Sequence, residues 1–321
     1  MEVIQISTSK TLNKKKQQRV SNRDVNAFSK FWDTLLTIIV GLFAFACVFP
    51  FLFVVIISFT NEKSLAKYGY RLIPKKWSLS AYDYVLNSSD SLIKAYGVTI
   101  FITVVGTILS LTIMSLYAYA ISRKGFKFRK FFTFYAFFTM LFGGGLVPTY
   151  LVVSRLLSLK NTVWALILPM ACGAWNILIL KTFFRTSVPD AIIESAKIDG
   201  ASEIRTFVQM VLPISLPAMA TIGLFCTLGY WNDWFNALLY IDNQNLMPLQ
   251  YLLMKIQNSM DFLTSNVTRM NSADSVKAVA QLPKNTARMA MVVLATGPIV
   301  LAYPFFQKYF VQGLTIGAVK E

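Results

Sequence analysis

Six long stretches of the chain are apolar and contain at most one charged residue each. They cover residues 34–59, 97–121, 131–153, 162–181, 214–241 and 289–307. Each has about the 20 residues that a helix needs to cross the hydrocarbon core of a bilayer. Lipid offers no hydrogen-bond partners to the backbone, and these stretches do not alternate as barrel strands do, so helices are the expected form. The pattern predicts an all-α integral membrane protein with six transmembrane helices.

Composition and charge agree with a chain embedded in a lipid bilayer. Of the 321 residues, 55% are hydrophobic and 14% are charged, whereas soluble domains contain about 25% charged residues. The net charge is +16, but the basic residues do not form a separate soluble module, so we expect anionic lipid as their partner and no nucleic acid. There is no histidine, and the three cysteines lie in apolar stretches. We therefore expect no metal site and no catalytic residues.

The basic residues also indicate the orientation of the chain. Residues 1–27 form a basic tail that we predict to be disordered and cytoplasmic, and residues 28–321 form the transmembrane domain. Six spans place both termini on the same side of the membrane. The tight loop between the second and third spans carries Arg123, Lys124, Lys127, Arg129 and Lys130. Short basic loops beside span ends are typical of the cytoplasmic side, so we expect both termini to be cytoplasmic.

A polar segment between the fourth and fifth spans, residues 187–213, has the pattern of two short helices joined by a turn. Pro189 suits the first turn of a helix, and Asp190 places a negative charge near its N-terminus. Gly200 suits a left-handed stop at the C-terminus of that helix, and Ser202 suits the N-cap of the next one. The spacing thus predicts a rigid bent pair of helices facing the cytoplasm.

The two predicted helices have distinct faces. In the first, a small and mostly apolar face would let another protein approach closely; its residues are Ala191, Ile192, Ser195 and Ala196. In the second, one apolar stripe has helical spacing; its residues are Ile204, Phe207, Val208 and Val211. An ordinary amphipathic surface loop is the alternative interpretation of the same pattern.

The same segment resembles the EAA motif of ABC-importer permeases. Glu194-Ser195-Ala196 is followed after three residues by Gly200, and after nine more by Met210-Val211-Leu212-Pro213. Ser195 stands where the motif has alanine, and Met210 stands where it has isoleucine. Further similarity in residues 140–150, 164–169, 229–240 and 288–320 identifies the chain as a member of the MalG-type carbohydrate permeases, of the LplC-like subgroup.

The resemblance implies a set of partners and a role for the EAA-type segment. Such permeases pair with a second, homologous permease chain, so a heterodimer is expected. Two cytoplasmic ATPase subunits dock on the pair, and an extracytoplasmic solute-binding protein delivers the carbohydrate. The segment would supply a coupling helix that contacts the ATPase through Glu194, Ser195, Ala196, Asp199, Gly200, Leu212 and Pro213. The C-terminal residues 313–320 would approach the same interface.

The absence of a nucleotide-binding sequence agrees with this division of labour. The chain contains no G-x-x-x-x-G-K-[ST] sequence, so it has no loop of the type that holds ATP phosphates. We therefore expect no cofactor in this chain, with ATP and Mg²⁺ bound by the partner ATPase. The chain would be a transport subunit in a bacterial plasma membrane and not an enzyme.

Candidate residues for the substrate path lie in the fifth and fourth spans. Asp233 is the only acidic residue well inside a predicted span, where a charge is costly unless it faces a wet cavity or a partner. Its neighbours combine aromatic rings with amides, a combination that suits a neutral polyol better than an anion: Tyr230, Trp231, Asn232 and Asn236. Trp175 and Asn176 form a weaker pair of the same kind. The alternative is that these residues hold the permease dimer together or form an interfacial belt.

The sequence thus predicts the permease subunit of an ATP-driven importer for a carbohydrate, with an oligosaccharide as the expected cargo. Two alternatives stay open at this stage. One is an ABC permease for a solute that is not a sugar. The other is a secondary transporter, which would need intramembrane ionisable residues for ion coupling, and the spans offer Asp233 alone.

Overall fold

A computed structural model describes residues 30–86, 89–266 and 282–318. The predicted tail, residues 1–27, and residues 319–321 lie outside the described residues. The chain divides into two units, residues 1–53 and 54–321. All elements of regular structure in the described residues are helical, and the only β-pairing there is one isolated bridge, between Thr60 and Trp77.

Helix α2 (Lys30–Ser58) begins in the first unit and contains Pro50. Its stretch Phe31–Ser58 is long and apolar enough to cross a membrane. The described residues of the first unit hold no other helix. This element agrees with the first predicted span, residues 34–59.

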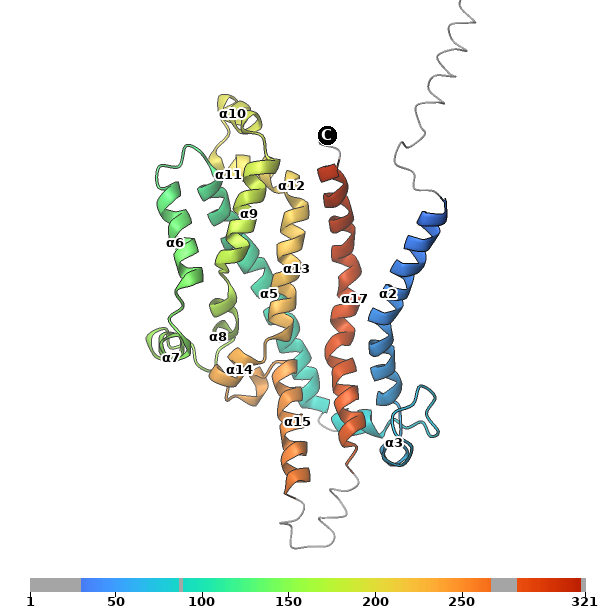
Figure 1. The fold of residues 1–321 in the computed structure, drawn as a ribbon. Helices are drawn as coiled ribbons and strands as arrows, with labels where there is room; N and C mark the ends of the chain where they lie inside the picture. The colour runs from blue at the N-terminus through green and yellow to red at the C-terminus, as the bar shows by residue number, and fades with distance from the viewer. Residues whose placement is uncertain (1–29, 87–88, 267–281, 319–321) are drawn as a thin grey trace, which may run out of the picture. The chain divides into compact units, whose positions relative to one another are not determined.

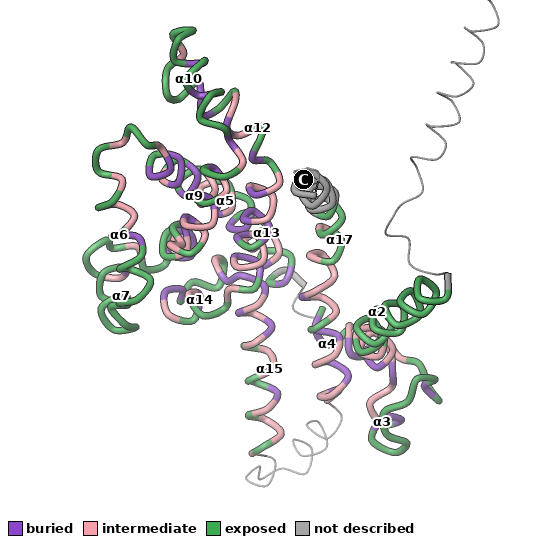
Figure 2. Tube along the Cα trace, turned by 45° about the horizontal axis from the view of Figure 1, so that its top comes forward, coloured by how far each residue is buried: buried purple, intermediate pink, exposed green. Residues whose placement is uncertain are grey.

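The second unit is a bundle around one long helix, α5 (Ser89–Ser122) (Figure 1). Helices α9 (Ala174–Ser187) and α13 (Leu216–Asn232) pack along it, and α6 (Arg129–Leu141) packs on α9. Helix α17 (Lys284–Ala318) packs against α13. Buried residues gather where α5, α9 and α13 meet (Figure 2). The core at this junction includes Met114, Ala118, Ile121, Ile177, Leu180, Phe184, Ile222 and Tyr230.

Shorter elements lie at the two ends of the bundle. At one end lie α10 (Asp190–Ile198), α11 (Glu203–Thr206), a π-helical turn (Phe207–Val211) and α12 (Leu212–Ile214) (Figure 1). Toward the opposite end lie α3 (Glu62–Tyr68), α4 (Ser80–Leu86), α14 (Phe235–Tyr240), a 3-10 turn (Gln244–Leu246) and α15 (Leu249–Ser265). The apolar residues Leu249, Leu253 and Met260 recur at helical spacing along α15 and are buried.

Three predicted spans are not single straight helices, and here the sequence prediction is wrong in detail. The third is α6 followed by α7 (Leu146–Leu151) and a π-turn (Val152–Leu156), with a bend of 112°. The fourth is α8 (Trp164–Ile167) with a 3-10 turn (Leu168–Met170), bent by 51° to α9. The fifth ends at Asn232 instead of continuing to residue 241, and α14 follows after a break. A third bent pair joins Glu203–Ile214 to Leu216–Asn232, with a bend of 85°. The described residues thus contain three helices able to span a membrane, or up to six if each bent pair is one span.

Glycine and proline account for two of these breaks. Gly145 adopts a φ of 83° between α6 and α7, a left-handed conformation that glycine adopts without strain. A Cβ atom added at Gly143 or Gly145 would meet no atom of the described chain within 4 Å. The glycines therefore open the helix here and do not serve close packing inside the chain. In the fourth span, Pro169 and Gly173 flank the break.

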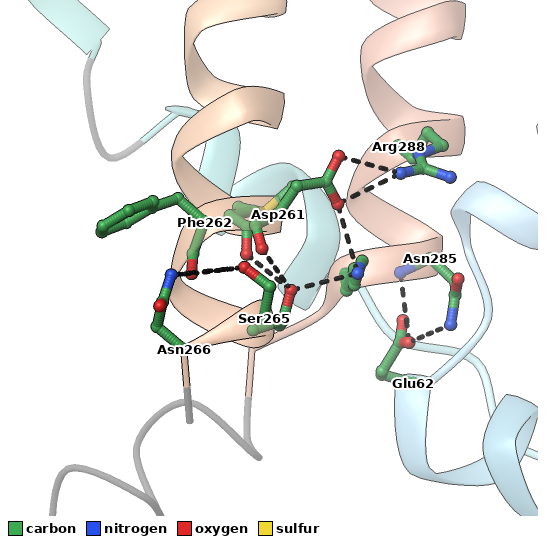
Figure 3. A network of polar contacts seen from close by, with 10 residues as sticks. Glu62, Asp261, Phe262, Ser265, Asn266, Asn285 and Arg288 are labelled. Carbon is green, nitrogen blue, oxygen red and sulfur yellow. Dashed lines mark hydrogen bonds and ion pairs between the residues drawn. The ribbon is translucent and has the colours of Figure 1, made fainter. Parts of the chain in front are cut away.

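A polar network connects helices α3, α15 and α17 at the end of the bundle opposite to α10 (Figure 3). The Glu62 carboxylate accepts hydrogen bonds from the backbone N–H groups of Asn285 and Thr286, at 3.1 and 2.9 Å, and from their side chains. It thereby caps the first turn of α17 from another helix, where a negative charge is favourable. Asp261 on α15 forms ion pairs with Lys284 at 3.2 Å and Arg288 at 3.3 Å, both on α17.

Candidate functional site: the α10–α12 segment and the Asp233 break

Helix α10 begins and ends where the sequence predicts. Pro189 is its N-cap residue and Asp190 lies in its first turn. At the C-terminus, Gly200 has a φ of 75°, its N–H donates to the Lys197 carbonyl, and the Ala201 N–H donates to the Ala196 carbonyl. These two hydrogen bonds form a Schellman motif, which stops a helix and turns the chain. The predicted turn at Gly200 is confirmed.

The second half of the segment follows the prediction at its start and departs from it afterwards. The Ser202 side chain accepts a hydrogen bond from the Arg205 N–H and caps α11, as predicted. A π-helical turn then replaces regular α-helix over Phe207–Val211. Because a π-helical turn contains more residues than an α-helical turn, the apolar residues predicted to form one stripe do not lie on one face. Phe207 and Val211 are buried, whereas Ile204 and Val208 are exposed.

The small-residue face predicted on α10 is also divided. Ile193 and Ala196 are buried against the rest of the chain, with Ala196 fully covered. Its side chain therefore cannot contact another protein, which corrects the expectation that it lies at a partner surface. The exposed residues among those predicted to face a partner are Ala191, Ile192, Glu194, Ser195, Asp199, Gly200 and Pro213, and Leu212 is half-buried. Ile198 and Ile204 protrude most, with exposed fractions of 85% and 73%.

Polar contacts fix this segment to α5 and to the loop that follows α5. The Tyr119 hydroxyl on α5 donates to Glu203 at 2.7 Å, and Lys197 pairs with the same carboxylate at 2.7 Å. These two contacts, the lysine first, hold the pKa of Glu203 below its usual value. Lys124 forms an exposed ion pair with Asp190 at 2.6 Å and lowers the pKa of that carboxyl. The segment is therefore a fixed protrusion of the bundle.

A hollow of about 400 Å³ lies beside the protrusion. Its lining includes Tyr119, Arg123, Phe126, Lys197 and Ile204. The sequence prediction missed Tyr119 and Arg123 as part of this site because they lie about 80 positions before Glu203 in the chain. Only the packing of α5 on α11 brings them there.

At the opposite end, Asp233 stops one helix and starts another. It lies just after α13 with extended backbone, and its carboxylate accepts hydrogen bonds from the Asn236 N–H at 3.2 Å and from the Asn236 side-chain amide at 2.9 Å. These contacts cap the start of α14. The prediction that Asp233 lies inside a continuous helical span is thus wrong. Its carboxylate has a structural role within the chain, as the cap of α14.

Tyr230 and Trp231 are buried, so we do not retain them as substrate contacts. The Tyr230 hydroxyl lies 2.9 Å from the Ser110 hydroxyl and donates to the Ile167 carbonyl at 3.0 Å. The Trp231 ring N–H donates to the Ala295 carbonyl at 2.8 Å. Both side chains therefore connect helices of the core.

The other candidates do not form one cluster. Asn232 is exposed and accepts a hydrogen bond from Gln250 at 3.3 Å. Trp175 is exposed on α9 and lines a shallow hollow with other α9 residues, while Asn176 is half-buried next to Gly173. Trp234, next to Asp233 in the chain, lines a different hollow, to which neither Trp175 nor Asn176 contributes.

A hollow of about 320 Å³ near Asp233 contains residues that the sequence prediction missed. Trp234 and Arg288 line it together with amides of α15: Gln250, Gln257 and Asn258. The Arg288 Nε–H is buried and has no hydrogen-bond partner in the described chain. An aromatic ring, amides and an unused charged donor can recognise a sugar ring with hydroxyl or carboxylate groups. Among the described residues, no three Cys, Asp or Glu side chains are grouped to hold a metal ion.

A pair of substitutions separates the role of Asp233 as a helix cap from a role of its charge in transport. Asp233→Asn keeps an oxygen that can accept from the Asn236 N–H, whereas Asp233→Ala removes the cap at a cost of about 1 kcal/mol. We expect the alanine variant to lower the thermal stability of the purified protein and the asparagine variant to retain it. If Asp233→Asn keeps stability but loses transport, the charge itself acts in transport; equal transport in this variant would assign the residue to the fold alone.

No profile of a known protein family matches the chain. Individual proteins, however, are similar to most of the chain. The polygalacturonan/rhamnogalacturonan transport system permease protein YtcP of Bacillus subtilis is 40% identical over 292 residues, which cover 91% of this chain and 99% of that protein. Protein LplC of the same organism is 42% identical over 273 residues, covering 85% and 89%. The chain belongs to the family of carbohydrate ABC transporter permeases.

A solved structure supports the same assignment. A bacterial ABC transporter involved in the import of the acidic polysaccharide alginate contains a chain that matches with a TM-score of 0.70 and 26% identity, over 89% of this chain and all of that chain. The resemblance inferred from the EAA-type segment is thereby confirmed. The permease is a multi-pass membrane protein and a transport subunit of an ABC import system, not an enzyme.

Proposed function

We propose that this permease forms, with a second homologous permease, the translocation path of an ATP-driven importer for an oligosaccharide in a bacterial plasma membrane. In this proposal the chain crosses the membrane six times, both termini are cytoplasmic, and two ATPase subunits bind ATP and Mg²⁺. The observation that carries it is the fixed protrusion α10–α12, which exposes Glu194, Ser195, Asp199 and Gly200 at one end of the bundle.

The proposal gives the two ends of the bundle different partners. The ATPase contacts the α10–α12 end, and an extracytoplasmic solute-binding protein delivers the carbohydrate at the end that carries α15. Because Tyr119 and Lys124 tie the protrusion to the bundle, a movement of the ATPase is transmitted to α5. Alternating access then follows from two states of the bundle that ATPase and substrate each favour to a different extent.

A cross-link between the protrusion and the ATPase tests this function. Ser195→Cys is introduced after the native cysteines, Cys47, Cys172 and Cys226, are replaced. We expect a membrane-impermeant thiol reagent to label it in inside-out vesicles, and a short cross-linker to join it to the ATPase in the purified importer. Labelling from the outside of intact cells, or uptake that continues without ATP, would support a secondary transporter instead.

A specific observation favours an acidic oligosaccharide over a neutral one. Arg288 lines the hollow beside Trp234 and has a buried Nε–H that the described chain does not use. Two similar proteins are named for the transport of acidic carbohydrates, polygalacturonan/rhamnogalacturonan and alginate. A uronate carboxylate would accept this hydrogen bond, whereas a neutral sugar offers a weaker hydroxyl acceptor.

Replacement of Arg288 tests the class of sugar. We expect Arg288→Gln to reduce uptake of uronate oligosaccharides at least about tenfold, because a hydrogen bond to a charged group contributes roughly 1.5–3 kcal/mol. Lys284→Gln is the matched control, since it removes the other cation on Asp261 but does not line the hollow. Equal losses in both variants, or an equal loss for neutral oligosaccharides, would contradict the role of Arg288 in recognising an acid.

A further inference from the structure

Another hollow, of about 380 Å³, lies between the end of α5, the start of α6 and the second half of α9. It is on the same end of the bundle as α10 (Figure 1). Four basic residues line it: Arg129, Lys130, Lys181 and Arg185. The function proposed above does not use any of them.

These four cations form no ion pair with a carboxylate of the described chain, although Asp190 lies within electrostatic range of Arg185. No carboxylate lines the hollow, and Arg129, Lys130 and Arg185 form no ion pair with a described residue. The Lys181 ammonium donates to the Thr133 hydroxyl at 3.2 Å, and it lies within electrostatic range of the Arg129 and Arg185 guanidinium groups. Like charges that are partly removed from water repel each other, so an anion between them is strongly favoured.

Two of the neighbouring basic residues behave differently. At the same end of the bundle, Lys124 pairs with Asp190 and Lys197 pairs with Glu203. Lys127 and Arg205 at this end also form no ion pair in the described chain, so the hollow is distinguished by the grouping of four basic residues around one space.

Apolar side chains also line the hollow, and two of them are exposed. Phe134 and Phe137 on α6 are exposed by 63% and 43%, and Leu178 on α9 lies beside them. The helical N-terminus of α6, at Arg129, adds a partial positive charge. A ligand that matches this lining has an anionic head and an apolar tail, and basic hollows between membrane helices are suited to acidic lipid headgroups.

We propose that this hollow binds the phosphate of an anionic phospholipid, with the acyl chains lying along Phe134, Phe137 and Leu178. The proposal requires only that the chain is embedded in a membrane. It does not depend on the contact between α10 and an ATPase.

Lipid cross-linking tests the site on the intact importer. The importer is reconstituted in nanodiscs of phosphatidylcholine that contain photoactivatable phosphatidylglycerol, and labelled peptides are identified by mass spectrometry. We expect labels on residues 129–137 and 178–185. In Lys181→Gln/Arg185→Gln the yield should fall roughly fivefold for each lost charge, the value of about 1 kcal/mol per basic residue near an anionic surface.

Two comparisons make the outcome decisive. Lys76→Gln/Lys127→Gln carries the same change in net charge outside the hollow and should label as the parent protein does. Excess inorganic phosphate should not reduce the labelling, because it lacks the acyl chains. Displacement by inorganic phosphate would show a site for free phosphate instead of lipid, and an equal loss in the control variant would show attraction by net charge only. Either result overturns the proposal, as does labelling that a correctly assembled Lys181→Gln/Arg185→Gln importer retains.

Discussion

Gly200→Val is expected to abolish co-purification of the ATPase while the permease still inserts in the membrane. Gly200 holds the left-handed conformation that closes the Schellman motif, with a φ of 75°. A β-branched residue in this conformation costs on the order of 1–3 kcal/mol. An added Cβ meets no described atom within 4 Å, so the effect comes from the backbone alone. The turn would open and displace Ser195 and Ile198 from their fixed positions.

Gly200→Asn is the matched control for this prediction. Asparagine enters the left-handed region far more readily than valine, so this variant should keep the turn and most of the ATPase binding. Binding is measured as the ratio of ATPase to permease after affinity purification, and transport as uptake of labelled carbohydrate. If Gly200→Val retains both the ATPase and uptake, then the geometry of α10 does not couple the two proteins.

The capping of α10 and α11 was predictable because it is local. Gly200 and Ser202 act on backbone groups within a few residues of themselves, and the structure confirms both assignments. Pro189, predicted in the first turn, is the N-cap residue one position earlier. The burial of Ala196 was not predictable in this way. Both sides of a short helix with small residues look alike in the sequence, and only the packing of α10 on the bundle decides which side is covered.

The breaks in the spans mark a second limit of the sequence. Average hydropathy along a stretch reports that it prefers lipid but not whether its helix is continuous. In the sequence itself, the three consecutive glycines from Gly143 to Gly145 indicate a break in the helix, whereas the hydropathy pattern places Asp233 inside a helix. Its carboxylate in fact accepts the hydrogen bonds that begin α14. An acidic residue before a helical run is a common cap, and that alternative explains the charge without a ligand.

The sequence does not predict the candidate hollows, because each is lined by residues that are far apart in the chain. Arg288 and Gln250 meet through the packing of α15 on α17, and Lys181 meets Arg129 through the packing of α9 on α6. No short motif contains either pair. In contrast, the aromatic residues of the fifth span formed a compact motif that suggested a ligand, although two of them are buried in the core.

Gly106→Ala is the second substitution with a large expected effect, and it tests that core. A Cβ at Gly106 on α5 would lie 2.6 to 2.8 Å from ring atoms of Tyr230 on α13. The ring cannot move freely, because its hydroxyl is held by Ser110 and by the Ile167 carbonyl. Overpacking of this kind costs about 1–3 kcal/mol. We expect a clear fall in the thermal midpoint of the purified permease and loss of its assembly with partner subunits.

Two further variants show whether the clash is the cause. Gly97→Ala lies on the same helix with no described atom within 4 Å of the added Cβ, so it should not lower stability. Tyr230→Leu removes the ring and leaves a cavity, so it should be destabilised by itself. Combined with Gly106→Ala, however, the new methyl group partly fills that space, and the two losses should be less than additive. Strict additivity would mean that Gly106 and Tyr230 do not pack together, and it would contradict the clash as the cause of the loss.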